Sequence, residues 1–384
     1  MKILSFSYCF PNQANPTWGM FVYQRLAALK EFEDLKVCSP VPWFPLIKGR
    51  AGITTEENLP NLRVYRQQFF YIPGVLKNTD AWFYTKGLRQ WLKELCRSWK
   101  PDVLDAHFVW PDGVGVASLA REMNIPYVIT LRGKIYECLK IPFQSRQCAN
   151  ALTGASAVIS VSSKMAEEAQ KLGVEKDCLH VILNGVDRER FRPRDKNDCR
   201  KALGLPEKNR LLVTVAHLGH RKGHHEVIHA LANLPDDVKL VIVGGDAQRG
   251  TQEGLSSIAQ DVGVGDRLIL SGPQPYDRIP LYFSAADASV LASYREGCPN
   301  AVLESLACGT PVIATDVGAV PDILPVPTVG RIVPPQQVEP LREAIAEVLD
   351  ASWNADEVVA KSGVQGWDNV AEKVQKVMKG VIST

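Results

Sequence analysis

Short apolar, β-branched runs alternate with helix-like segments along most of this 384-residue chain. The runs are KILSFS, DLKVCS, DVLDAH, YVITL and AVISVS in the first half, then LLVTVA, KLVIVG, RLILSG, ASVLAS and PVIAT in the second. Such alternation is typical of βα units, and runs that are apolar on both faces belong to parallel strands covered by helices. The pattern therefore predicts an α/β fold with doubly wound, Rossmann-like domains.

The chain is too long for one comfortable core, so we expect two domains of similar size. The charged, proline-containing segment RERFRPRDKNDCR (188–200) is the predicted linker. This places an N-terminal domain at 1–190 and a C-terminal domain at 191–365. Residues 366–384 contain the helical pattern GWDNVAEKVQKVMKG, in which Val370, Val374 and Val377 have helical spacing and no strand follows.

Composition excludes several classes of protein. The net charge is only +2, with both signs interspersed, so nucleic acid is not an expected partner. Nine cysteines without a C-x-x-C pair argue against a disulfide framework or a zinc site and favour a reducing cytoplasm. The N-terminal apolar run is too short for a signal peptide, and no run is long enough to span a membrane. Any membrane contact is therefore expected to be peripheral, at the inner face.

Two segments rich in aromatic and basic residues interrupt the alternation: VPWFPLIKGR (41–50) and YRQQFFYIPGVLK (65–77). They are either decorated loops or surfaces for an acceptor or a membrane, because exposed apolar patches edged with cations suit interfaces. The helix predicted over 81–100 has an apolar face, interpreted as core packing, made of Trp91, Leu92, Leu95 and Trp99.

Ligands of open α/β sheets lie beyond the carboxyl ends of the strands, so the loops there are the first place to look for function. After LLVTVA, the residues Arg221, Lys222 and Gly223 lead into a helix. A lysine beside backbone amides at a helix start is suited to phosphate, although a solvated basic turn is the alternative.

The stretch REGCPNAVLESLACGTPVIAT (295–315) has two glutamates, Glu296 in a loop and Glu304 in a helix that ends before Gly309. Asn300 is the predicted N-cap. Ionised carboxylates accept hydrogen bonds from adjacent sugar hydroxyls, and the amides of Asn300, Ala301 and Val302 could face a diphosphate. Pro299 has no amide hydrogen to offer. The alternatives are that Glu296 and Glu304 are surface charge or a pair of catalytic acids. A glycosidase-like acid pair is disfavoured, because its two carboxyl groups must flank one glycosidic bond with the substrate between them.

Four segments together resemble the retaining, GT-B-fold glycosyltransferases of family 4, also called glycosyl transferases group 1. These are EGCPNAVLESLACGTPVIAT, LNGVDRERFRP (183–193), HLGHRKGHHEVIHAL and DAHFVWPDG (105–113). The resemblance implies two Rossmann-like domains facing across a cleft, with the C-terminal helix crossing back to the N-terminal domain. It also implies transfer of a hexose-type sugar from a UDP- or GDP-sugar to a hydroxyl of a glycan or lipid-linked acceptor, with no cofactor.

The resemblance also assigns roles to residues. Glu296 is expected to bind the donor sugar, Glu304 the ribose and Lys222 the diphosphate, with His107 near the reacting carbon. Thr130 and Arg132 occupy the neighbouring strand end on the sugar or acceptor side, and Gly19 matches the glycine of a loop that phosphate or acceptor approaches closely. Where many relatives have an arginine after the strand, this chain has His217, and Arg221 is the candidate to replace the missing cation.

The resemblance further implies that the departing phosphate oxygen takes the acceptor's proton, so no general base is required. The chain lacks a D-x-D pair, and we predict no required metal. Two alternatives stay open at this point. One is a GT-B nucleotide-sugar epimerase, and the other is a two-domain protein that binds a nucleotide sugar without chemistry.

Overall fold

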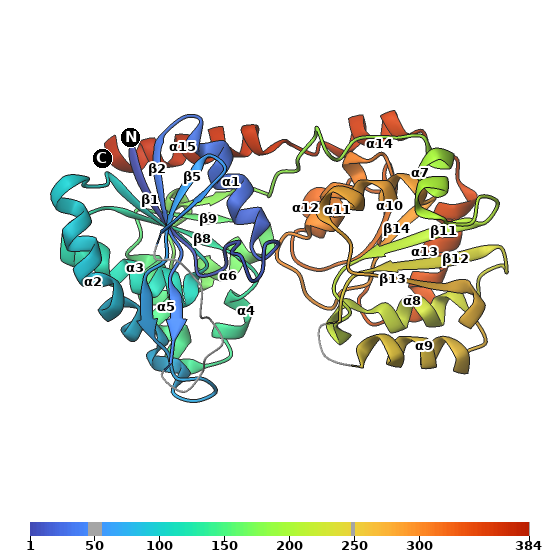
Figure 1. The fold of residues 1–384 in the computed structure, drawn as a ribbon, viewed down its shortest axis with the longest axis horizontal. Helices are drawn as coiled ribbons and strands as arrows, with labels where there is room; N and C mark the ends of the chain where they lie inside the picture. The colour runs from blue at the N-terminus through green and yellow to red at the C-terminus, as the bar shows by residue number, and fades with distance from the viewer. Residues whose placement is uncertain (45–55, 247–249, 384) are drawn as a thin grey trace. The chain divides into compact units, whose positions relative to one another are not determined.

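A computed structural model describes residues 1–44, 56–246 and 250–383. The chain divides into two compact units (Figure 1). Unit 1 consists of Met1–Asn184 and Trp367–Thr384, and unit 2 consists of Gly185–Gly366. The sequence analysis put the boundary at 190, so the structure moves it by a few residues and joins the last helix to the first unit.

Unit 1 is built on a sheet in the order β10-β9-β8-β7-β1-β2-β5-β4, in which every pairing is parallel except that of β4 with β5. The strands are β1 (Lys2–Phe6), β2 (Asp34–Cys38), β4 (Glu56–Leu59), β5 (Leu62–Tyr65), β7 (Val103–His107), β8 (Tyr127–Leu131), β9 (Ala157–Ser160) and β10 (Leu179–Val181). A separate ribbon pairs β3 (Val41–Trp43) with β6 (Gln68–Phe70). The strand order reverses between β1 and β7, which is where a doubly wound sheet binds ligands.

Helices cover both faces of this sheet (Figure 1). They are α1 (Met20–Lys30), α2 (Asp80–Ser98), α3 (Val114–Met123), α4 (Ile135–Cys138), α5 (Pro142–Thr153), α6 (Ser163–Lys171) and α15 (Trp367–Ser383). Helix α15 packs on α1 and buries one apolar stripe in the core of unit 1: Trp367, Val370, Ala371, Val374 and Met378. The predicted C-terminal helix is therefore present, and its partner is the first helix of the chain.

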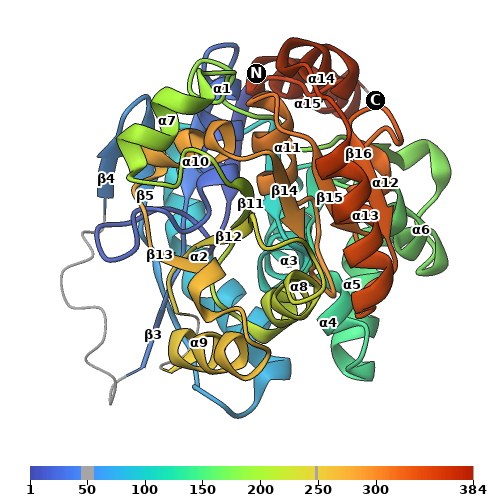
Figure 2. The ribbon, with the colours of Figure 1, turned by 90° about the vertical axis from the view of Figure 1, so that its right-hand side faces the viewer.

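Unit 2 has a fully parallel sheet in the order β13-β12-β11-β14-β15-β16, the strand order of a dinucleotide-binding domain. The strands are β11 (Arg210–Val215), β12 (Val238–Val243), β13 (Leu268–Gly272), β14 (Ala288–Leu291), β15 (Val312–Thr315) and β16 (Gly330–Val333). Figure 2 shows β14 and β15 side by side within this sheet. The order reverses between β11 and β14, so the loops after these two strands flank the expected ligand position.

Two groups of helices cover this second sheet. Helices α8 (His224–Leu231), α9 (Thr251–Asp261) and α13 (Val338–Asp350) share one core cluster. The second group forms a chain of contacts in which α7 (Lys196–Leu203) packs on α10 (Ile279–Ala285), α10 on α11 (Asn300–Ala307), and α11 on α14 (Ala355–Ser362). Helix α12 (Val320–Ile323) also contacts α11. All strands expected from the sequence are present. Strands β4, β5 and β16 and the ribbon β3–β6 were not expected.

Two local predictions need correction, and a third falls mostly outside the described residues. The segment 188–200, predicted as the linker, lies inside unit 2, where Phe191 is buried against Phe283 and residues 196–203 form α7. The buried face of α2 centres on Tyr84, Leu88 and Leu92 instead of Trp91 and Leu95, which are only half-buried. Of the segment 41–50, residues 45–50 lie outside the described part of the chain.

Candidate functional site

In unit 2 the loops after β11 and β14 bring Lys222 and Glu296 together. The ammonium Nζ of Lys222 donates to Oε1 of Glu296 at 2.5 Å, across 74 positions of sequence. Both side chains are largely but not fully buried, with 13% and 11% of their surface exposed. A cation and a carboxylate thus lie next to each other at the switch point of the sheet, where each can reach a ligand.

Glycine at position 223 explains how the lysine loop comes so close to β14. Gly223 has φ +68° between the turn His220–Lys222 and α8, and a Cβ atom there would lie 2.0 Å from the carbonyl oxygen of Ala292. Only glycine fits such a backbone conformation at such a distance. The two loops are further joined by the amide of Tyr294, which donates to the Arg221 carbonyl at 2.9 Å.

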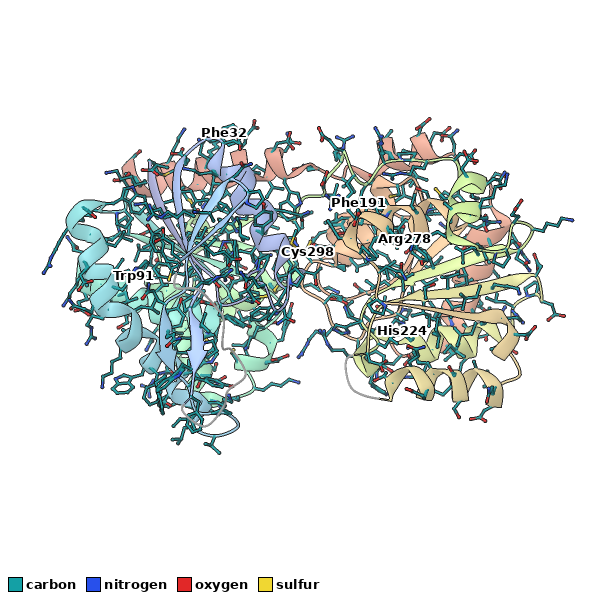
Figure 3. The ribbon with its side chains drawn as sticks, in the orientation of Figure 1. Phe32, Trp91, Phe191, His224, Arg278 and Cys298 are labelled. Atoms are coloured by element: carbon teal, nitrogen blue, oxygen red, sulfur yellow. The ribbon has the colours of Figure 1, made fainter. Side chains whose placement is uncertain are left out.

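Arg221 points its guanidinium toward the same loop, where it donates to the carbonyl of Arg295 at 3.3 Å. The side chain is otherwise exposed. His217, at the end of β11, is also exposed, and its carbonyl accepts a hydrogen bond from Nε2 of the buried His224 at 3.1 Å (Figure 3). Burial lowers the pKa of His224 to about 4, so this histidine is a neutral structural group near pH 7.

Glu304 lies on α11 and is 9% exposed. The hydroxyl of Tyr276 donates to Oε1 of Glu304 at 3.2 Å. Burial raises the pKa of Glu304 to about 7, although the Tyr276 hydrogen bond lowers it in part. The ring of Tyr276 is held between Phe191, labelled in Figure 3, at 5.4 Å and the guanidinium of Arg190 at 4.9 Å.

The first turn of α11 differs from the prediction in two ways. Pro299, with φ −74° and ψ 105°, is the extended residue that precedes the helix, so Asn300 is already helical and is not the N-cap. The amide of Val302 donates to the carbonyl of Pro299 at 3.1 Å and is therefore not available to a ligand in this structure. Asn300 and Ala301 are the other two residues of this helix start whose amides were predicted to face a diphosphate.

The loop after β15 supports the segment that carries Glu296. Gly318 has φ +53°, and a Cβ atom there would lie 2.4 Å from the Gly297 carbonyl oxygen and 2.5 Å from that of Glu296. The amide of Ala319 donates to the same Gly297 carbonyl at 2.8 Å. Three strand-end loops thus hold Glu296 in place, and any side chain at position 318 would displace it.

In unit 1 the switch point holds a buried polar cluster around His107. Its Nε2 lies 3.1 Å from Oδ2 of Asp105, two residues earlier on the same face of β7. Asp105 also accepts from the hydroxyl of Ser5 at 2.7 Å, its register partner on β1. The guanidinium of Arg25, on α1, donates to Thr130 at 2.7 Å and to Asp105 at 3.5 Å.

The charges within this cluster are set by burial and by mutual contact. Burial lowers the pKa of His107 to about 4, and Arg25 lowers it further, although Asp105 opposes the shift. Burial alone would raise the pKa of Asp105, but His107, Arg25 and the Ser5 hydroxyl hold it below its usual range. At neutral pH the cluster therefore contains a neutral histidine, an ionised aspartate and a cationic arginine.

Arg132 connects this cluster to the last residue of unit 1 that precedes unit 2. Its guanidinium donates to Oδ1 of Asn184 at 3.1 Å, lies 3.4 Å from Nδ1 of His107 and covers the Phe21 ring at 4.6 Å. Arg132 is 4% exposed, so the group is a positioned cation of the strand end instead of a surface charge. His107, Thr130 and Arg132 are thus brought together, as the sequence predicted.

Gly19 begins α1 with φ +75°, and a Cβ atom there would lie 2.3 Å from the carbonyl oxygen of Cys9. The loops Tyr8–Phe10 and Thr17–Gly19 therefore touch through their backbones. After His107, the chain passes through Phe108 with φ 74°, an unusual conformation for a bulky residue that is often found at functional sites.

Metal ligation has no candidate among the residues that the structure describes. Within 1–44, 56–246 and 250–383, no three His, Cys, Asp or Glu side chains are grouped so that they could hold a metal ion. The loops of unit 2 offer the cations Arg221 and Lys222, the carboxylates Glu296 and Glu304 and backbone amides, which are groups suited to a polar anionic ligand. Unit 1 offers the neutral His107 beside Arg132.

Comparison with known sequences agrees with this geometry. Residues 195–364 match the family described as Glycosyl transferases group 1, and residues 49–190 match Glycosyltransferase Family 4. A Bacillus subtilis protein named putative teichuronic acid biosynthesis glycosyltransferase TuaC is 32% identical over an alignment of 372 positions that covers 90% of this chain and 88% of TuaC. This chain is a family 4 glycosyltransferase.

Other relatives of this family 4 glycosyltransferase differ in their named substrates. The 2-deoxystreptamine glucosyltransferase of Streptomyces kanamyceticus is 28% identical over 77% of this chain and 78% of its own length. Among solved structures, sucrose-phosphate synthase from Thermosynechococcus elongatus has a TM-score of 0.82 at 21% identity, covering 100% of this chain and 99% of that one. Anabaena Alr3699/HepE in complex with UDP has a TM-score of 0.78 at 19% identity, with 99% and 100% covered. These structural similarities show that the enzyme has the GT-B fold.

The sequence analysis of this glycosyltransferase missed three residues of the site. Asp105 was detectable in principle, because residues two apart on a strand share a face and it precedes His107 by two. Arg25 and Tyr276 carried no local signal. They reach Thr130 and Glu304 across 105 and 28 positions, and only the packing of α1 and the turn before α10 brings them there.

Proposed function

We propose that this glycosyltransferase transfers a hexose-type sugar, with retention of anomeric configuration, from a UDP- or GDP-sugar to a hydroxyl of a glycan or lipid-linked acceptor. We further propose that it works in cell-surface polysaccharide synthesis, at the cytoplasmic face of a membrane. The name of TuaC supports the pathway class, and the UDP and UDP-glucose complexes of HepE support the donor class.

The observation that carries the proposal is the Lys222–Glu296 ion pair with Glu304 eight residues further on. The diphosphate would pair with Lys222, and sugar hydroxyls would donate to Glu296. Binding of the donor would therefore replace the Lys222–Glu296 ion pair by one ligand contact for each residue. Glu304, aided by Tyr276, would accept from the ribose hydroxyls. The amides of Asn300 and Ala301 at the start of α11 would add to the phosphate contacts.

Under this proposal, the enzyme accelerates transfer by electrostatic stabilisation of the leaving group. Departure of the leaving group places negative charge on the diphosphate, which Lys222, Arg221 and the α11 amides would stabilise. The neutral His107 would orient the sugar ring together with Glu296. A departing phosphate oxygen would take the proton of the attacking hydroxyl, so no side chain is assigned as general base.

The donor can be identified by thermal shift. A ligand that binds the native state raises its melting temperature, so the enzyme is screened against uridine, guanosine and adenosine diphosphate sugars. One base should produce a clear shift. No shift with any nucleotide sugar at millimolar concentration would contradict the proposed donor class.

Alanine at either partner of the central ion pair tests the site. Lys222→Ala and Glu296→Ala should each reduce transfer about a hundred- to a thousandfold, because each removes a charge that stabilises the transition state. Lys208→Ala, on an exposed loop of unit 2, is the matched control and should retain full activity. Steady-state release of nucleoside diphosphate is the measurement, and near-normal turnover in both site variants would contradict the assignment.

Metal removal is a separate test. Since Lys222 and the α11 amides are assigned the charge stabilisation, transfer in excess chelator should stay within about twofold of the untreated rate. Complete loss of turnover that returns with added divalent cation would show that a metal ion performs this role.

Product analysis separates the alternatives. A transferase releases the nucleoside diphosphate and forms a glycoside, whose anomeric proton coupling shows by NMR whether configuration is retained. An epimerase would instead return a changed sugar on intact nucleotide. A tight nucleotide-sugar complex without turnover under any acceptor would favour a binding protein.

A further inference from the structure

Unit 1 has an exposed apolar surface where β3, β6 and the start of α2 meet. Four side chains are about half or more exposed: Leu76 (62%), Val75 (58%), Trp82 (57%) and Trp43 (48%). Ring contacts join Trp82 to Phe83 at 4.8 Å, Phe83 to Phe70 at 4.9 Å and Phe70 to Trp43 at 6.4 Å. We call these six residues the aromatic surface. Exposed apolar side chains gathered in one region of a unit are typical of an interaction site.

The tip of this surface is held in a fixed, unfavourable backbone conformation. Leu76 has φ 52°, in the left-handed region that a branched side chain rarely adopts. Its carbonyl accepts hydrogen bonds from both the amide of Thr79, at 2.9 Å, and the Thr79 hydroxyl, at 2.7 Å. Val75 and Leu76 are thus exposed in a segment whose backbone conformation is energetically unfavourable, and such strain tends to persist where it has a function.

Two lysines lie beside the aromatic surface. Residues 66–93 contain five basic residues, of which Arg66 is buried against Glu57 and both Arg89 and Lys93 pair with Glu122, and one acidic residue, Asp80, which is buried. Lys77 lies 3.9 Å above the Tyr71 ring, and Lys86 lies 5.1 Å from the Trp82 ring. Within the part of the chain that the structure describes, neither lysine has a carboxylate within 4 Å. Both ammonium groups therefore lie beside the apolar side chains without a carboxylate in contact, although the buried Asp80 is close enough for Lys77 to oppose the rise in its pKa.

We propose that the aromatic surface docks this enzyme on an anionic lipid bilayer, with Val75, Leu76 and Trp82 entering the interfacial region and Lys77 and Lys86 meeting the headgroups. A bilayer satisfies both features at once, because it offers an apolar interior directly beneath negative charge. Tryptophan is also suited to the boundary between the two. The inference extends the proposed function by favouring an acceptor presented at a membrane, but docking itself involves no substrate.

The experiment is co-sedimentation of the full chain with vesicles of phosphatidylcholine alone or mixed with phosphatidylglycerol. The unaltered enzyme should bind the mixed vesicles, and Val75→Ser with Leu76→Ser should weaken that binding about tenfold. Lys77→Gln with Lys86→Gln should weaken it roughly fivefold per lysine and remove the preference for the anionic lipid. Val181→Ser, which replaces an exposed apolar residue of β10 in the same unit, is the control and should bind as the unaltered chain does.

Three outcomes would overturn the inference. They are no binding of the unaltered chain to mixed vesicles, binding unchanged in both double variants, and a dimer in analytical ultracentrifugation that Val75→Ser with Leu76→Ser dissociates. The last would identify a second copy of the chain as the occupant. Melting curves with and without the nucleotide sugar show whether each variant folds. They also keep the two claims apart, since a donor-induced shift without vesicle binding leaves the proposed transfer standing.

Discussion

At the scale of single residues, burial of Glu304 favours the protonated carboxyl, whereas the proposed ribose contact uses the ionised form. Its carboxyl is buried with one hydroxyl donor, and its pKa is about 7 instead of the ordinary value near 4.3. Between these two values the folded protein holds a proton that the unfolded chain has released. The free energy of unfolding therefore falls as pH rises through this window. The stability that the protonated Glu304 carboxyl contributes is fully present only below the window.

Glu304→Gln removes this titration. Without nucleotide, the stability of the variant relative to the unaltered enzyme should improve by roughly 1–3 kcal/mol between about pH 5 and about pH 8. Urea unfolding at the two pH values measures the difference. A difference that does not change with pH would show that the carboxyl is already ionised in the folded protein.

The same substitution should weaken donor binding. A neutral amide accepts from the ribose hydroxyls less strongly than a carboxylate does, so the Kd for the nucleotide sugar should rise about ten- to a hundredfold. Isothermal titration at about pH 8, where the carboxylate of the unaltered enzyme is ionised, is the measurement. Equal affinities would remove Glu304 from the nucleotide site.

His107 and Asp105 show the opposite arrangement of charge. Both have lowered pKa values, so both contribute stability that is present at neutral pH and is lost as pH falls. Burial is the largest cause for His107, whereas contact with His107 and Arg25 lowers the pKa of Asp105; the buried guanidinium of Arg25 adds to both shifts. Acid should accordingly destabilise unit 1, as protons bind to His107 below its ordinary pKa and to Asp105 at still lower pH.

At the scale of elements, glycines at helix starts decide how closely the loops approach one another. Gly19 before α1 and Gly223 before α8 both have positive φ, and both face a carbonyl oxygen that a Cβ atom would strike. The helices begin at the switch points of the two sheets. Each unit thus has a glycine with positive φ before the helix that begins at its switch point, where ligands of such sheets bind.

Gly19→Ala should destabilise unit 1 by about 2 kcal/mol or more, because the left-handed backbone and the contact with Cys9 both oppose a side chain. Gly254→Ala, within α9, is the matched control. A Cβ atom there meets nothing within 4 Å outside its own helix, so alanine should stabilise by roughly 0.5–1 kcal/mol. Denaturant unfolding measures both. Similar effects from the two changes would mean that the loop at Gly19 adapts.

At the scale of the whole molecule, residues from both ends of the chain complete unit 1. The terminal ammonium of Met1 pairs with Glu33 at 2.6 Å, and Gln375 of α15 donates to the same carboxylate at 2.7 Å. The apolar stripe of α15 fills the core beside α1. The last helix is therefore part of the fold of unit 1, although 182 residues of unit 2 separate it from the rest.

Met378→Ala should lower the stability of unit 1 by about 2–5 kcal/mol, because it leaves a cavity in a core position that is fully buried. Lys376→Ala, on the exposed face of the same helix, should change stability by less than about 0.5 kcal/mol. Tryptophan fluorescence during urea unfolding reports mainly on unit 1. Equal stability of the two variants would show that α15 is not part of the cooperative core.

Local patterns in the sequence were sufficient for the α/β class, the positions of most strands, and the placement of Lys222, Glu296 and His107 at strand ends. Strand periodicity and glycine positions act over a few residues, so they can be read from short windows. Resemblance to a family supplied the roles of these residues, which periodicity cannot.

Only the tertiary structure decided which side chains meet. The Tyr276–Glu304, Arg25–Thr130 and Ser5–Asp105 contacts depend on strand order and helix packing, which no short window contains. The start of α11 also escaped local reasoning, because Pro299 with its fixed φ already supplies the extended residue that Asn300 was expected to provide. Likewise, the apolar spacing of α15 predicted a helix, but its partner α1 follows from the topology of the chain, since an apolar stripe does not specify what will cover it.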